Sequence, residues 1–144
     1  MKKDKPDVNK WESAEHVSAY LTRTNLPHAE EIRNAVLEQI PSDVNRILDL
    51  GTGDGRLMAL VKLKNPKAEG VALDFSEPML KLARERFAKD NLVKVVKHNL
   101  AFPLPAAQLG SFDLIISGLA IHHVTHERKK QLYQEIFNLE VLYP

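Results

Sequence analysis

The chain has 144 residues, of which 44% are hydrophobic and 27% charged, which is typical of one globular domain with its own core. A formal net charge of +1 is too small to indicate nucleic acid or a membrane surface as a partner, and no apolar run is long enough to cross a membrane. The absence of cysteine excludes disulfides, thiolate catalysis and thiolate metal sites, and without a secretory signal we expect a cytoplasmic protein.

The first 43 residues predict a helical cap. Helical spacing of apolar residues indicates a short helix over 11–24, and Pro27 stands where a second helix should begin. This second helix would end at Pro41. Its expected apolar face consists of Ile32, Ala35, Val36 and Ile40.

From residue 44 onward, strand and helix patterns alternate. The expected strands cover 44–50, 70–74, 91–97 and 112–117. The expected helices cover 55–64, 76–89 and 125–139, and 99–111, with two prolines and a glycine, should be a loop. This order predicts an α/β protein with a doubly wound parallel sheet. We therefore expect a single domain over 1–144, with a helical cap at 1–43 and a core at 44–144.

A glycine-rich turn follows the first expected strand. Residues 49–55 read Asp-Leu-Gly-Thr-Gly-Asp-Gly, and such glycines allow a tight turn and let a ligand lie against the backbone. A dinucleotide phosphate is one candidate ligand, but its fingerprint is G-x-G-x-x-G, whereas this loop is G-x-G-x-G. Asp49 also suits a cationic partner better than a phosphate. A turn that only packs strand against helix is the plainer alternative.

An aspartate, Asp74, ends the second expected strand. In a doubly wound sheet this position faces the same crevice as the glycine turn, and a carboxylate there can accept both hydroxyls of a ribose. Any nucleoside, including a dinucleotide, would satisfy it. A simple helix cap is the alternative, although Ser76 is already placed to cap that helix. Met79 could pack on a nucleobase, but a methionine on an apolar face more often belongs to the core.

Four motifs, in order and spacing, resemble class I S-adenosylmethionine (SAM)-dependent methyltransferases, most of all their bacterial small-molecule group. They are Asp49-x-Gly51-x-Gly53-x-Gly55, Asp74-Phe75-Ser76-x-x-Met79-Leu80, Asn99-Leu100 and Phe112-Asp113-Leu114-Ile115-Ile116-Ser117. The resemblance covers roughly 11–137. It implies a Rossmann-like sheet with strand order 3-2-1-4 in the part present, preceded by two helices.

The resemblance also implies where SAM or its product S-adenosylhomocysteine (SAH) would bind. Asp49 would hold the glycine loop and approach the methionine end of SAM, near Ser117, while Asp74 would bind the ribose hydroxyls. The expected SAM-binding residues are Asp49, Gly51, Thr52, Gly53, Gly55, Asp74, Phe75, Met79, Asn99, Leu100 and Ser117, with Tyr20 and Arg23 from the cap. For Tyr20 the alternative is simple packing, and for Arg23 it is solvation.

The resemblance places adenine beside Phe75, with Asn99 at its amino group and the backbone amide of Leu100 at the ring. Asn99 stands where the family usually has an aspartate. Its side-chain carbonyl can still accept a hydrogen bond from the amino group. Without the charge this bond should be weaker.

Two adjacent histidines, His122 and His123, follow the fourth expected strand. A histidine there could deprotonate a methyl acceptor, and His122 is the stronger candidate for this general base. Adjacent histidines on an extended segment point apart, and His126 alone does not complete a site, so we expect no metal. Structural support of the pocket wall is the alternative for both.

In the family, the sheet normally continues after the last helix with a glycine turn and strands 5–7, and no such pattern follows Leu139. We therefore expect a shortened domain whose fourth strand is an open apolar edge, which a homodimer could cover.

The expected activity is methyl transfer from SAM to a small-molecule acceptor by in-line displacement, which depends on positioning more than on an obligatory catalytic residue. A domain that binds SAM or SAH without turnover is one alternative. A nicotinamide-dependent oxidoreductase is another, which the glycine spacing disfavours.

Overall fold

The computed structural model describes residues 29–118 and 120–140. The strands are β1 (Arg46–Leu50), β2 (Glu69–Asp74), β3 (Val93–Lys97) and β4 (Leu114–Ile116). The helices are α2 (Ala29–Gln39), α3 (Arg56–Lys64), α4 (Glu77–Arg86), α5 (Ala106–Leu109) and α6 (His126–Leu139), with a 3₁₀ turn η2 (Ala120–His123). The expected helix over 11–24, with Tyr20 and Arg23, lies outside the described residues.

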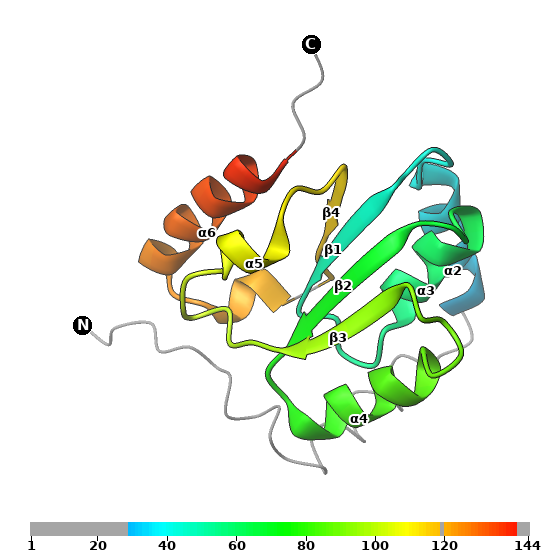
Figure 1. Cartoon of the computed structure of the whole chain (residues 1–144), viewed down its shortest axis with the longest axis horizontal. Helices are drawn as coiled ribbons and strands as arrows, with labels where there is room; N and C mark the ends of the chain where they lie inside the picture. Colours follow the sequence, from blue (N-terminus) through cyan, green and yellow to red (C-terminus); the bar gives the residue numbers. More distant parts are fainter. Residues whose placement is uncertain (1–28, 119, 141–144) are drawn as a thin grey trace.

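The four strands form one parallel sheet in the order β3-β2-β1-β4, which confirms the predicted fold class and strand order (Figure 1). In the register, Leu50 lies beside Leu73, and Asp49 lies beside Ile116. The carboxyl ends of β1, β2 and β4 therefore meet at one edge of the sheet. This is the edge at which ligands of such sheets bind.

Helices cover both faces of the sheet, and each face has its own apolar core (Figure 1). Because side chains alternate along a strand, Leu48 and Leu50 pack toward α5 and α6, whereas Ile47 packs toward α3. Burial on both sides explains why β1 and β2 read as almost continuous apolar runs. In α2, by contrast, Ala35 is exposed, so the predicted apolar face of that helix is narrower than expected.

Most of the described elements begin and end within two residues of the prediction, and two differ by more. The segment expected to be a loop contains α5, a single helical turn between Pro105 and Gly110, whose φ of 76° ends it. The helix expected to reach Lys89 ends at Arg86, because Phe87 leaves helical geometry and turns its ring toward Gly55. Tertiary packing overrides local helix propensity there.

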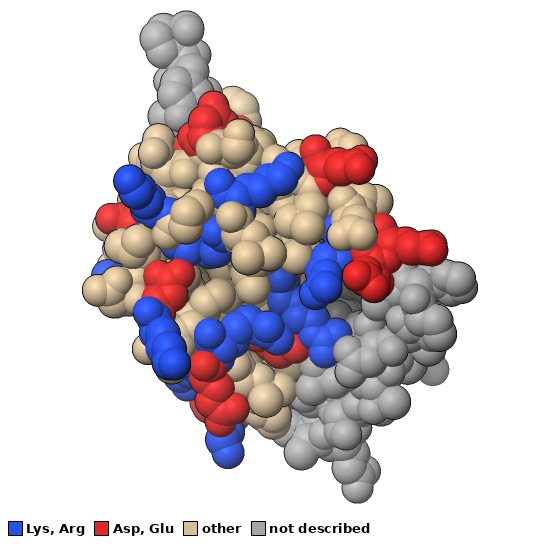
Figure 2. All heavy atoms as spheres, turned by 90° about the vertical axis from the view of Figure 1, so that its right-hand side faces the viewer, with Lys and Arg blue, Asp and Glu red and all other residues tan. Residues whose placement is uncertain are grey.

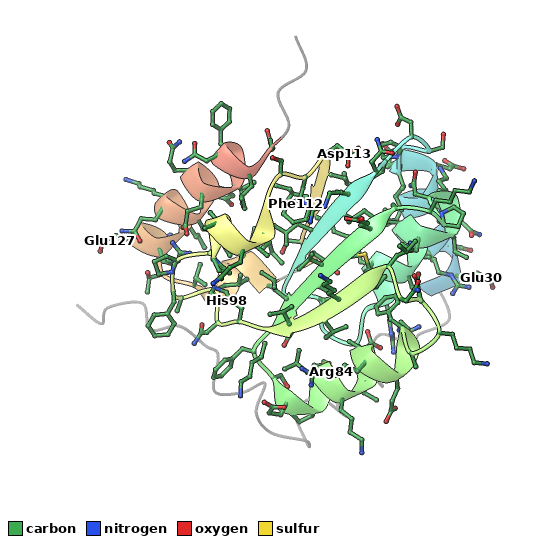
Figure 3. All side chains as sticks on the ribbon, viewed as in Figure 1. Glu30, Arg84, His98, Phe112, Asp113 and Glu127 are labelled. Carbon is green, nitrogen blue, oxygen red and sulfur yellow. The ribbon has the colours of Figure 1, made fainter. Side chains whose placement is uncertain are left out.

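Strand β4 pairs with β1 along one side. Along its other side, the described residues contribute one parallel bridge, between Phe112 and Glu140, where the amide of Phe112 donates to the carbonyl of Leu139 (2.8 Å). Phe112 and Asp113 lie at the amino end of the sheet, away from His98, which follows β3 at the carboxyl end (Figure 3). No helix in the described ranges is long and apolar enough to span a membrane.

Charges on the face shown in Figure 2 are mixed: lysine and arginine side chains alternate with acidic ones and with uncharged surface. Ion pairs of the described residues include Arg46 with Glu69 and Lys97 with Glu77. Among the described residues that this view shows, the basic side chains form no continuous stripe of the kind that follows a nucleic acid backbone.

Candidate functional site

Asp49, at the end of β1, is the most deeply buried carboxyl group of the site. It is 1% exposed, and its Oδ2 accepts a hydrogen bond from the Thr52 hydroxyl (2.7 Å). Its Oδ1 has no hydrogen-bond partner among the described residues. Burial raises the pKa of this carboxyl from 3.8 to about 7; the bond from Thr52 lowers it, and the charge of nearby Asp74 raises it further. A buried acceptor without a donor is costly, and a cationic ligand would relieve that cost.

Asp74, at the end of β2, joins the glycine loop to the start of α4. Its Oδ2 accepts from the amide of Gly53 (2.8 Å) and its Oδ1 from the amide of Ser76 (2.9 Å). Burial raises the pKa of Asp74, while backbone N–H groups, that of Ser76 first, act against this rise. Ser76 caps α4 by accepting from the amide of Met79 (3.4 Å), so Asp74 is more than a helix cap.

The three loop glycines all have positive φ, but only one of them faces open space. A Cβ on Gly51 (φ 72°) would lie 2.0 Å from the Cβ of Ala120, and one on Gly55 (φ 89°) 2.6 Å from the ring of Phe87. A Cβ on Gly53 would meet only the sulfur of Met79, at 3.9 Å. Gly51 and Gly55 are therefore required by packing, and Gly53 is the glycine at which the backbone stays open to a ligand.

We expect Gly55→Ala to lower the free energy of unfolding by about 1–2 kcal/mol, because alanine is strained at this φ and its Cβ would collide with Phe87. Gly118→Ala is the matched control, because its φ is not positive and no described atom lies within 4 Å of the new Cβ. Urea unfolding of both variants measures the difference. Equal stabilities would show that the loop adapts to a side chain.

The loop after β3 lies on the side where the sequence predicts adenine, and several of its polar groups form hydrogen bonds within the loop itself. The Asn99 side-chain oxygen accepts from the amide of Ala101 (2.9 Å), so one lone pair of the expected adenine acceptor is already engaged. The amide of Leu100 has no acceptor among the described residues. Among the described residues, then, Leu100 offers a backbone donor without an acceptor, as does the amide of Asn99, and the Asn99 side chain also shapes the turn.

Two further predicted residues line the region between β2 and the loop. Phe75 is half-buried, and the ammonium of Lys97 lies 5.6 Å from its ring centroid, so one side of this aromatic ring is already contacted by a cation. Met79 is 1% exposed and packs beneath Gly53, which is the core position that the sequence favoured for a methionine here.

Ser117 and the histidines follow β4. The Ser117 hydroxyl donates to the carbonyl of Leu50 (2.8 Å), and this bond ties the tips of β4 and β1 together. The backbone of His122 and His123 lies in η2, so the expected extended segment is wrong: Val124 donates back to Ile121 in a turn that brings Ala120 onto Gly51. The side chains of both histidines lie outside the described part of the structure.

Three ion pairs that support the site, two of them made by Asp54, were not predicted from the sequence. Asp54, inside the glycine motif, pairs with Arg56 (2.8 Å) and Arg86 (3.3 Å), and Arg86 also donates to the Asp54 carbonyl. Asp54 therefore fastens the loop to the end of α4. The third pair, Arg128 with Glu135, lies in α6. These partners could not be paired from sequence. Asp54 and Arg86 are 32 positions apart, and Arg128 and Glu135 are 7 apart, beyond the i+3 and i+4 neighbours that helix spacing rules pair.

Residues 47–140 match the family model described as "Methyltransferase domain". The chain belongs to this family. The resemblance drawn from the four motifs is thus confirmed, and the parallel sheet in the order β3-β2-β1-β4 is that of a class I, Rossmann-like methyltransferase domain.

Curated relatives of this methyltransferase domain are named for different substrates. The chain is 39% identical over 93 residues to "Release factor glutamine methyltransferase" of Deinococcus radiodurans, covering 63% of this chain and 32% of that protein. It is 33% identical over 111 residues to "Malonyl-[acyl-carrier protein] O-methyltransferase" of Xylella fastidiosa (74% and 37%). It is 41% identical over 81 residues to "Demethylmenaquinone methyltransferase" of Thermus thermophilus (55% and 34%). The chain therefore spans about a third of the length of these relatives.

Solved structures of methyltransferases share the fold of this domain. An O-methyltransferase family protein from Burkholderia thailandensis aligns with a TM-score of 0.73 at 15% identity, over 96% of this chain and 42% of that one. N-methyltransferase NodS from Bradyrhizobium japonicum, in complex with SAH, aligns with a TM-score of 0.70 at 14% identity (83% and 60%). The "DhpI-SAM-HEP complex" aligns with a TM-score of 0.74 at 20% identity (95% and 60%).

Proposed function

We propose that this domain binds SAM at the carboxyl ends of β1 and β2 and transfers its methyl group to a small-molecule acceptor. The observation that carries the proposal is the pair Asp49 and Asp74. These two aspartates are held at adjacent strand ends, burial raises the pKa of both, and Asp49 Oδ1 has no described partner. Two desolvated carboxyl groups with a free acceptor favour a ligand that brings positive charge and donors.

The residues present fit SAM better than a dinucleotide. SAM carries an ammonium group and a cationic sulfur, which suit the Asp49 oxygen that has no described partner, whereas a pyrophosphate would be repelled by Asp49. The open backbone at Gly53 and the second lone pairs of the Asp74 oxygens would hold the ribose. The free amide of Leu100 would donate to the adenine ring.

In the proposed reaction the chain's residues bind and orient. When bound, SAM supplies a methyl group on a good leaving group, so in-line approach of the acceptor is what the protein must arrange. Asp74 fixes the glycine loop through Gly53, and Ser117 fixes the tip of β4 through Leu50, so the two walls of the site hold one geometry. His122 stays a predicted general base for acceptors that lose a proton.

The small-molecule acceptor is the finer part of the proposal, and its support is the resemblance of the motifs to the bacterial small-molecule group. The relatives' names include a protein substrate as well as demethylmenaquinone, so a protein acceptor is the competing outcome. A domain that binds SAM or SAH without turnover is the alternative function. A homodimer covering the open side of β4 stays a prediction.

Calorimetric titration of the chain with SAH and, separately, with NAD tests the proposed cofactor. We expect SAH to bind and NAD not to bind, because Asp49 beside the glycine turn disfavours a pyrophosphate. Binding of NAD without SAH would overturn the proposal. Methyl transfer from SAM to a panel of metabolites, with a release-factor peptide as the protein arm, then separates the acceptor classes from binding without turnover.

A further inference from the structure

A buried arginine of α6 forms hydrogen bonds with the backbone of the loop that follows β3. Arg128 is 7% exposed, and its guanidinium donates to the carbonyl oxygens of Leu100 (2.8 Å) and Phe102 (2.8 Å). The same guanidinium pairs with Glu135, whose other oxygen accepts from the amide of Leu104 (2.6 Å). The ion pair therefore holds this loop at both ends, and we name residues 100–104 the adenine-side loop.

This set of hydrogen bonds requires the geometry of an arginine side chain. Its planar fork directs separate N–H groups at two carbonyls and a carboxylate, which the single ammonium of lysine cannot reproduce. The partners also compensate for burial of the charge, because Arg128 and Glu135 lie together on α6 and their remaining bonds all go to the adenine-side loop. The α6 amide of Arg128 is itself capped by Thr125 (3.2 Å), which fixes the start of the helix.

The adenine-side loop connects Arg128 to the proposed binding site through Leu100. The backbone amide of Leu100 has no described acceptor, and its carbonyl accepts a hydrogen bond from Arg128. The side chain of Leu100 is buried, and its Cδ1 lies 3.8 Å from where a Cβ of Gly51 would be. Fixing Leu100 therefore fixes both its free amide and its contact with the glycine loop.

We propose that Arg128 is a positioning residue for nucleoside recognition, acting through the carbonyls of Leu100 and Phe102. The inference rests on the proposed function, since it takes the free amide of Leu100 as a donor to the base. Arg128 does not itself contact the ligand. Its contribution is to hold the adenine-side loop in the orientation that recognises the base edge.

The test compares two ligands, SAH and S-inosylhomocysteine, the analogue in which oxygen replaces the adenine amino group. For Arg128→Lys we expect the Kd of SAH to rise about tenfold. We also expect the preference for SAH over the inosine analogue to fall at least about threefold, since a loosened loop recognises the base edge less well. Calorimetry gives both constants, and amide hydrogen exchange of the adenine-side loop should become faster.

Arg46→Lys is the matched control. Arg46 also donates to two loop carbonyls, those of Leu109 (3.1 Å) and Ser111 (2.6 Å), and pairs with a carboxylate, Glu69 (3.1 Å), but at the amino end of the sheet. Its loss should reduce stability and leave both Kd values within about twofold of the wild type.

The outcomes separate this inference from the proposed function. Wild-type protein that binds no SAH overturns both. The inference alone is overturned if the wild type binds SAH and folded Arg128→Lys shows an unchanged Kd for SAH. It is also overturned if the variant loses affinity equally for the two ligands. If that variant does not fold, Glu135→Gln replaces it, since glutamine keeps an acceptor for Leu104 but loses the ion pair. The same fall in SAH preference is then expected, and its absence overturns the inference.

Discussion

Asp74→Ala is expected to weaken SAH binding by about 1.5–3 kcal/mol, which is roughly ten- to a hundredfold in Kd. The carboxylate accepts from the amides of Gly53 and Ser76, and its free lone pairs face the proposed ribose site. Alanine would leave two amides without their acceptor and remove the contact to the ribose. Calorimetric titration with SAH measures the loss.

Asp113→Ala is the control for this result. Asp113 also accepts two backbone amides, those of Asn45 (2.8 Å) and Arg46 (2.7 Å), but it lies at the opposite end of the sheet (Figure 3). Its removal should lower stability without changing SAH affinity. If Asp74→Ala bound SAH as tightly as the wild type, the role of Asp74 would be only to hold the backbone of Gly53 and Ser76.

Asp49→Asn is expected to make the protein more stable than the wild type at pH 8 and about equally stable below about pH 4. In the folded protein the pKa of Asp49 is about 7, because of burial first and the charge of Asp74 as well, against an ordinary 3.8. Between these values the folded state holds a proton that the unfolded state has released, so wild-type stability falls as the pH rises from about 4 to 7. The upper limit of that loss is about 4 kcal/mol.

Urea unfolding at several pH values measures this difference, because asparagine resembles the protonated aspartate and does not titrate. Thr52→Val is a second test of the raised pKa of Asp49. Without the hydroxyl that donates to Asp49, the pKa should rise further, and the loss of stability should extend to higher pH. A stability difference between Asp49→Asn and wild type that does not change with pH would show that Asp49 is not protonated near neutrality.

Much of the fold was readable from local patterns. Apolar runs such as Ile47 to Leu50 indicate a strand buried on both faces, and Ser76 with Pro78 marks the start of a helix. Strand and helix alternation then leaves few arrangements besides a parallel sheet. The positions of Asp49 and Asp74 at strand ends follow from this order alone.

The detail of the site depended on contacts between distant segments. Gly51 and Gly53 look equivalent in the motif, yet Ala120 packs on one and leaves the other open. The hydroxyl of Ser117 is engaged by Leu50, a residue 67 positions away, which no spacing rule indicates.

By itself, then, the sequence determined the fold class, the order of the elements and the strand ends that carry Asp49 and Asp74, because these follow from periodicity and turn chemistry within short segments. Only the tertiary structure decided which backbone stays open at Gly53, which oxygen of Asp49 lacks a partner, and that Arg128 holds the adenine-side loop. Those features depend on how side chains from separate elements fill shared space and satisfy one another's hydrogen bonds.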